Sequence, residues 1–245
     1  ETAVKMAKHY RHLTGKNGAF KILSRRFSYH GATAMAVSLG GSPAADSVGP
    51  TMPGAIYVNN WNSYRMPYEG DPIDVAVKCA NEFETVIIHE GPDSVAAIIA
   101  EPVSAATGIH IPPPEYWHRL REIADTYDIV LIADEVINGF GRLGTWFRTE
   151  RFGIQPDVTT VAKAITSGYL PLGAAIATKK IGEKSRDPPI PEKWAESMFD
   201  LVSAHDSSNK PIFNPTQVFM EDPGKKTKQV LSFTPPSKAK KPAPT

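Results

Sequence analysis

Three ionisable side chains in this sequence each directly follow an apolar run, and they are Glu101, Asp134 and Lys163. Taken alone, an acidic residue in such a place is commonly a cap or a turn residue, and a lysine there is commonly a surface charge. Together, an amine and a carboxylate that face one crevice have the chemistry that a pyridoxal cofactor requires. The amine forms a Schiff base with the aldehyde, and the carboxylate keeps the pyridine nitrogen protonated so that the ring accepts electrons.

Five short segments predict the strands that would position these side chains: 21–25, 96–100, 129–133, 158–162 and 174–178. The last four are apolar without polar alternation, which is typical of buried and mostly parallel strands. Helices are predicted over 3–13, from Pro72 to about 85, and over 116–127. Glycines and prolines between 40 and 54 predict a long loop that runs into an aromatic, turn-rich stretch at 57–70. The pattern therefore predicts an α/β fold, in which ligands bind beyond the carboxyl ends of the strands.

The composition narrows the classes of function. The chain has 245 residues, with 27 Lys and Arg against 26 Asp and Glu, so its formal net charge is +1. This balance gives no support for nucleic acid as a partner. A single cysteine, Cys79, excludes a disulfide framework and a multi-cysteine metal site. No apolar run approaches the roughly 18 residues of a membrane span, so we expect no membrane partner either.

Composition also divides the chain in two. We expect residues 1–182 to form one folded unit and residues 183–245 to be a largely disordered tail rich in Pro and Lys. The 61 residues from Ser185 onward hold ten of the 22 prolines, and only 194–202 could form a short helix there. Such a segment cannot bury enough apolar surface to offset its ordering entropy. Because the first residue is Glu1 and falls within a helical pattern, we expect the chain to be part of a longer protein.

One long segment carries a family resemblance. Residues 132–168 read IADEVINGFGRLGTWFRTERFGIQPDVTTVAKAITSG, with an apolar strand, Asp-Glu-Val, a Gly-Phe-Gly-Arg turn, Pro-Asp, and a lysine shortly before Ser-Gly. This segment closely resembles the signature of the class III pyridoxal-phosphate-dependent aminotransferases. Supporting matches are Tyr29-His30-Gly31, Tyr64-Arg65, Glu101-Pro102 and the stretch 169–174. The resemblance extends over about residues 1–182 and implies the large domain of a fold-type I pyridoxal-phosphate enzyme, with pyridoxal 5'-phosphate as cofactor.

The resemblance also implies a role for each matching residue. Lys163 would form the link to the cofactor and then move the proton between the substrate carbon and the cofactor. Asp134 would hold the ring nitrogen, Val136 would pack on one face of the ring, and Tyr29 would stack on the other.

Two further matching residues would have supporting roles. His30 would be a polar neighbour of the ring or a hydrogen-bonded structural histidine, and the second role is the commoner one for such a residue. Glu101 would orient the site. No metal site is expected.

Several features depart from the family. Members carry a Gly-Ser turn, which cradles the cofactor phosphate, before the segment that matches Glu1. After Gly182 they continue into a segment that contacts the phosphate across a homodimer, and then into a small domain with a carboxylate-binding arginine. Ala164 stands where Gly is expected, and Leu143 stands where Thr is common.

The implied function is transfer of an amino group from an amine or ω-amino acid to a 2-oxo acid such as pyruvate, in a homodimer. Ornithine, acetylornithine, 4-aminobutyrate and diaminopelargonate aminotransferases and glutamate-1-semialdehyde aminomutase share the core signature. The alternative is a catalytically inactive, truncated homologue that acts as a binding or interaction protein. Cytoplasm is the expected compartment by default, with mitochondrion and plastid left open.

Overall fold

The computed structural model describes residues 1–62, 64–65, 67–105 and 108–184. The chain divides into two units, Glu1–Pro188 and Pro189–Thr245, and every described residue lies in the first. The predicted disordered tail includes the last two residues of helix α7 (Lys179–Lys184). The rest of the tail lies outside the described residues, as does the predicted helix over 194–202. In the described part of the chain, no helix is both long and apolar enough to cross a membrane.

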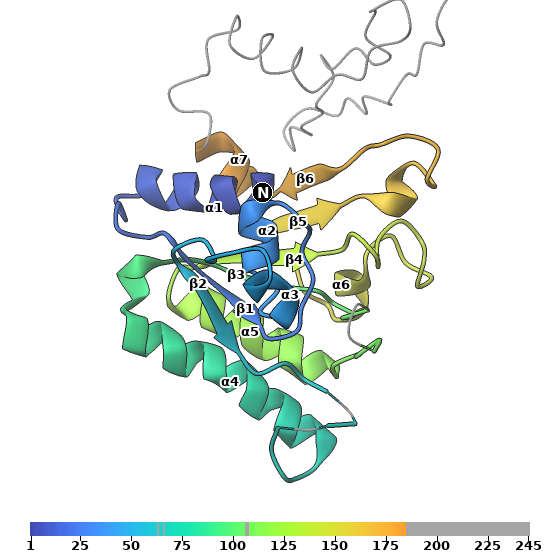
Figure 1. Cartoon of the computed structure of the whole chain (residues 1–245), viewed down its shortest axis with the longest axis horizontal. Coiled ribbons are helices and arrows are strands. Elements are labelled where there is room, and N and C mark those ends of the chain that lie inside the picture. Colours follow the sequence, from blue (N-terminus) through green and yellow to red (C-terminus); the bar gives the residue numbers. More distant parts are fainter. Residues whose placement is uncertain (63, 66, 106–107, 185–245) are drawn as a thin grey trace, which may run out of the picture. The chain divides into compact units, whose positions relative to one another are not determined.

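A six-stranded sheet forms the centre of this unit (Figure 1), in the order β2-β1-β3-β4-β5-β6. Its strands are β1 (Lys21–Arg25), β2 (Ala55–Val58), β3 (Val95–Ala100), β4 (Val130–Asp134), β5 (Val158–Val161) and β6 (Ala174–Ala177). The first five pair in parallel, and β6 pairs antiparallel with β5. The predicted α/β class and the mostly parallel sheet are confirmed.

Helices cover both faces of the sheet (Figure 1). One face packs against α4 (Pro72–Glu90) and α5 (Pro114–Thr126), and the other packs against α1 (Thr2–Leu13), α2 (Ala34–Ser38) and α7. Adjacent strand residues divide between the two cores, because successive side chains point to opposite faces. Leu131 therefore lies in the core under α4 and α5, whereas Ile132 lies in the core under α1.

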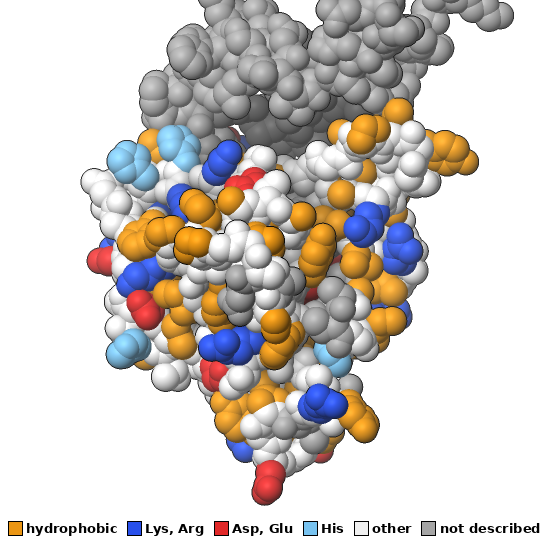
Figure 2. Space-filling model, viewed as in Figure 1, with side chains coloured by type: hydrophobic (Ala, Val, Ile, Leu, Met, Phe, Trp, Pro, Cys, Tyr) orange, Lys and Arg blue, Asp and Glu red, His pale blue; other side chains and the backbone are white. Residues whose placement is uncertain are grey.

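The remaining elements are short. They are α3 (Pro43–Asp46), α6 (Arg148–Arg151) and the 3₁₀ helices η1 (Pro92–Ser94) and η2 (Lys163–Ile165). Lys and Arg side chains are scattered among hydrophobic ones on the face that Figure 2 shows, with no continuous basic or acidic area. This distribution agrees with the near-zero net charge.

The structure corrects four details of the predicted elements. Strand β2 and helix α3 lie in the region predicted as loop, because segments of four residues are too short for a periodic signal. Strand β6 is antiparallel and partly exposed, not buried, because it forms the edge of the sheet. Helix α4 begins at Pro72 as predicted, capped by the Asp71 side chain, but it continues to Glu90 and ends at Gly91, whose φ is 83°.

The only cysteine of the chain offers a test of this packing. Cys79 is completely buried on α4, and burial together with the nearby Glu82 carboxylate raises the pKa of its thiol to about 12. Because the thiolate is the reactive form, we expect no reaction of the native chain with a disulfide reagent at pH 8. One thiol per chain should react in denaturant, which serves as the control. Rapid reaction of the native chain would contradict the described packing of α4.

Candidate active site

The carboxyl ends of four parallel strands meet at one edge of the sheet and supply the predicted site residues. Strand β1 leads into Tyr29 and His30, β3 into Glu101, and β5 into Lys163, while Asp134 is the last residue of β4. The register places Asp134 beside Thr160 of β5. An open parallel sheet binds ligands at this edge, so the topology brings the predicted residues to one region.

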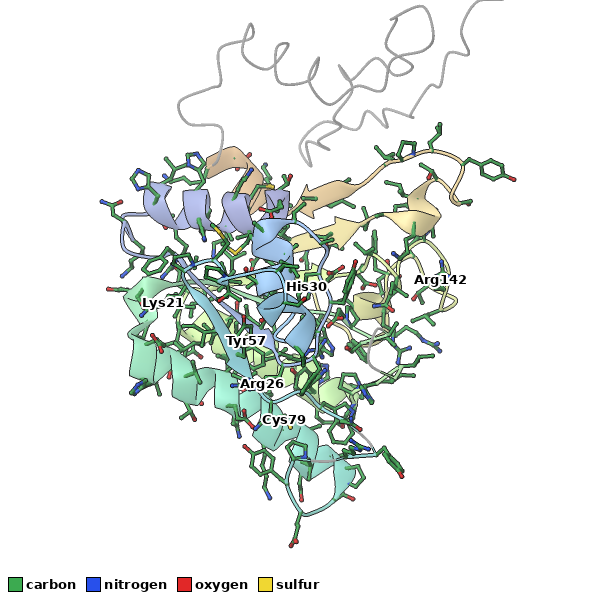
Figure 3. The ribbon with its side chains drawn as sticks, in the orientation of Figure 1. Lys21, Arg26, His30, Tyr57, Cys79 and Arg142 are labelled. Atoms are coloured by element: carbon green, nitrogen blue, oxygen red, sulfur yellow. The ribbon has the colours of Figure 1, made fainter. Side chains whose placement is uncertain are left out.

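A buried carboxylate–imidazole pair lies at the centre of this edge. His30 Nδ1 lies 2.8 Å from Asp134 Oδ2, and both side chains are buried. The other carboxylate oxygen, Oδ1, accepts a hydrogen bond of 3.2 Å from the Val136 backbone N–H. His30 Nε2 is buried and has no hydrogen-bond partner among the described residues. Figure 3 shows His30 near helix α2.

This pair lines a pocket of about 410 Å³. His30, Asp134, Val136 and Thr160 contribute to its wall, together with the first residues of α1 and the start of β6. The Thr160 hydroxyl is also buried and has no hydrogen-bond partner among the residues that the structure describes. The pocket therefore combines apolar walls with a few unsatisfied polar atoms, which is typical of small-molecule sites.

The structure brings some of the predicted residues together and leaves others apart. His30, Asp134 and Val136 share the pocket wall, whereas Tyr29, Glu101 and Lys163 do not line it. Lys163 is exposed at the start of η2, with φ at 47°. A positive φ is uncommon for a residue other than glycine, and it occurs frequently at functional sites.

Glu101 is tied to the segment that carries Tyr29 and His30. Its Oε1 atom accepts a hydrogen bond of 3.1 Å from the Tyr29 N–H, and its Oε2 atom accepts one of 2.7 Å from Arg25 Nη2. Arg25 also donates a 2.8 Å hydrogen bond to the Glu101 carbonyl. The residue Tyr29, by contrast, is 54% exposed. Glu101 therefore positions the turn after β1.

Glu135 has a local structural role. Its carboxylate accepts hydrogen bonds from the backbone N–H groups of Arg148 and Thr149 at the start of α6, 3.1 and 2.8 Å long. Burial raises the pKa of Glu135 despite these hydrogen bonds. The side chain thus caps a short helix beside the pocket.

Sequence reasoning missed two residues of this region. Arg25 lay within a predicted strand. Its charge could have identified it as a site residue, because a buried arginine needs a carboxylate partner. Thr160 gave no signal, since a threonine within a strand is ordinary.

The fold and the site together define the class of protein. It is an open α/β unit with a carboxylate–imidazole pair in a pocket beyond the ends of its parallel strands. Residues 1–189 match the family model described as "Aminotransferase class-III". The chain belongs to the class III aminotransferase family.

Known relatives agree with this assignment. A probable aminotransferase of Mycobacterium tuberculosis is 45% identical over 76% of this chain and 40% of its own length. The putrescine–pyruvate aminotransferase of Pseudomonas aeruginosa is 39% identical over 75% of this chain and 40% of its own length. The solved structure of an amine transaminase from an uncultivated Pseudomonas species, in its PLP-bound form, superposes with a TM-score of 0.74. It is 39% identical, with 76% of this chain and 43% of that one covered. The chain thus spans about 40% of the length of the curated relatives that it matches.

The buried pair Arg25–Glu101 gives a stability prediction. Replacing Arg25 with methionine leaves the Glu101 carboxylate buried without its cation, so we expect a loss of about 3–5 kcal/mol in the free energy of unfolding. The matched control is Lys16→Met, since Lys16 and its partner Asp93 are 37% and 77% exposed and such a pair contributes about 1 kcal/mol or less. Denaturant unfolding measures both. Equal, small losses in the two variants would show that the buried pair does not hold β1 to β3.

Proposed function

We propose that this chain is the cofactor-binding part of an aminotransferase that moves an amino group from an amine or ω-amino acid to a 2-oxo acid such as pyruvate. The observation that carries the proposal is the buried Asp134 carboxylate, held by His30 and Val136 in the pocket of a class III family member. Support for pyruvate as acceptor comes from the relative named putrescine–pyruvate aminotransferase. A second copy of the chain is the proposed partner.

The residues of the pocket fit pyridoxal 5'-phosphate. A carboxylate has about four acceptor positions, and Asp134 uses two of them toward His30 and Val136. Asp134 can therefore accept a further hydrogen bond from a protonated ring nitrogen. The buried Nε2 atom of His30 has no hydrogen-bond partner among the described residues. Because buried polar atoms are nearly always hydrogen-bonded, this atom is also available to a ligand.

In this proposal each residue has one task. Asp134 holds the ring nitrogen in its protonated form, and His30 fixes the orientation of the Asp134 carboxylate. Val136 packs against one ring face, Tyr29 against the other, and Glu101 holds the backbone of Tyr29 in place. When bound, the cofactor supplies an electron sink for the carbon that carries the amino group.

Lys163 has the remaining task, which is chemical. We propose that its Nζ atom would hold the cofactor at the aldehyde, and that as a free amine it would carry the proton between the substrate carbon and the cofactor. The exposed position of Lys163 at the end of β5 leaves the amine free for this role.

Covalent labelling tests the lysine. The full chain is incubated with pyridoxal phosphate, reduced with borohydride and digested for peptide mapping by mass spectrometry. We expect a pyridoxyl group on Lys163 and none at that peptide in Lys163→Ala. The control Lys179→Ala removes another exposed lysine and should leave the label unchanged. Label scattered over surface lysines would favour the alternative of a non-catalytic homologue.

Substitution of Asp134 tests this carboxylate as the hydrogen-bond acceptor for the ring nitrogen of the cofactor. Asp134→Asn keeps a carbonyl oxygen for His30 but loses the charge, so we expect the Lys163 label to persist while cofactor affinity falls by about tenfold or more. Absorbance titration measures the affinity, and formation of alanine from pyruvate and a diamine measures turnover, which should fall as well. Asp93→Asn, at an exposed site, is the control. Affinity and turnover equal to those of the parent would remove Asp134 from the site.

A further inference from the structure

A second pocket, of about 350 Å³, lies beyond the ends of β1 and β2 and shares only the edge of the sheet with the proposed active site. Its polar wall consists of Arg26, Arg65, His110 and three asparagines, Asn59, Asn60 and Asn62, and its apolar wall consists of Phe27 and Pro67. No residue of this pocket lines the first one. The proposed aminotransferase chemistry makes no use of it.

The pocket has unbalanced positive charge. Neither Arg26 nor Arg65 forms an ion pair with a carboxylate among the residues that the structure describes. The carboxylate of Glu82 does not line the pocket. Its two oxygens already accept hydrogen bonds from the N–H and Nδ2 groups of Asn59, 2.8 and 2.9 Å long, and one from the Tyr68 hydroxyl. Two guanidinium groups are therefore available to a ligand.

The backbone around Arg26 is held in place. Its N–H donates a 2.9 Å hydrogen bond to the Val58 carbonyl, and its guanidinium lies over the Tyr57 ring, 5.7 Å from the centroid. Figure 3 shows Arg26 and Tyr57 close together. The next residue, Phe27, has a positive φ of 57° and is 51% exposed. This strained backbone keeps an aromatic ring at the pocket instead of in the core.

The segment that carries Arg65 is also fixed. The Oδ1 atom of Asn62 accepts hydrogen bonds from the N–H groups of Tyr64 and Arg65, 2.9 and 2.8 Å long. Trp61 is buried and donates a 3.3 Å hydrogen bond to the Ile111 carbonyl, next to His110. Three hydrogen-bonded segments therefore supply the lining of the pocket.

We propose that this pocket binds a small organic anion, with its phosphate or carboxylate group held by Arg26 and Arg65 and its apolar part against Phe27 and Pro67. Planar guanidinium groups match the oxygens of both kinds of anion in bidentate geometry. The buried Oδ1 atom of Asn60 has no hydrogen-bond partner among the described residues and offers an acceptor to a ligand hydroxyl. The volume leaves room for an organic body beside the anionic group.

Calorimetric titration of the full chain tests the proposal. The probes are phenyl phosphate, inorganic phosphate and benzoate, in phosphate-free buffer of low ionic strength, since salt screens exposed charges. We expect one saturable site. Arg26→Gln and Arg65→Gln should each weaken binding by about tenfold or more. Binding of phosphate probes alone, or of benzoate alone, identifies which anion the site prefers.

Matched variants separate the pocket from general charge effects. Arg151→Gln removes an exposed arginine elsewhere and should leave binding unchanged. Phe27→Asn, which suits the positive φ, should weaken phenyl phosphate and leave inorganic phosphate unaffected. A Cys79 thiol that does not react in the native state shows that each variant is folded. Absence of saturable binding, or equal affinity in the parent, Arg26→Gln and Arg65→Gln, would overturn the proposal. Lys163 labelling should be unaffected in Arg26→Gln, so this proposal and the proposed function fail independently.

Discussion

The buried ion pair between Arg25 and Glu101 is the interaction on which the candidate site depends. It joins the carboxyl ends of β1 and β3 through the side chains and also through the Glu101 carbonyl. Since Glu101 also holds the Tyr29 N–H, the turn after β1 has a defined path. That path brings His30 to Asp134 at the end of β4, two strands away. This ion pair is costly to desolvate, and it lies where it fixes the turn that carries Tyr29 and His30.

The polar side chains at this edge of the sheet contrast with the apolar strands that lead to it. Strands β3 and β4 are buried along their whole length, and their side chains fill the two cores. The backbone needs new hydrogen-bond partners where the strands end. The carboxylates of Glu101, Asp134 and Glu135 accept hydrogen bonds from backbone N–H groups there. The apolar sheet therefore forms the packed core, and the residues just after it carry the polar side chains of the proposed site.

Much of the fold could be predicted from the sequence, because the central strands are continuous apolar runs and the long helices have clear periodicity and caps. The shared strand-end location of Glu101, Asp134 and Lys163 followed from the same pattern. Their mutual geometry did not, since contacts such as His30 with Asp134 join residues that are 104 positions apart. Edge elements were also missed or misjudged. Strand β2 has only four residues, and the direction of β6 depends on the path of the loop before it, which carries no periodic signal.

The antiparallel pairing of β6 has a consequence for the lysine. Val161 pairs with Ala174, so the chain leaves β5 and re-enters the sheet beside the same pocket. Lys163 thus lies within a closed loop that is clamped at both ends, not on a free extension of a strand. Closing a loop restricts the volume that its residues explore. In the proposed function, this clamped loop would limit how far the Lys163 amine can lie from the end of β5.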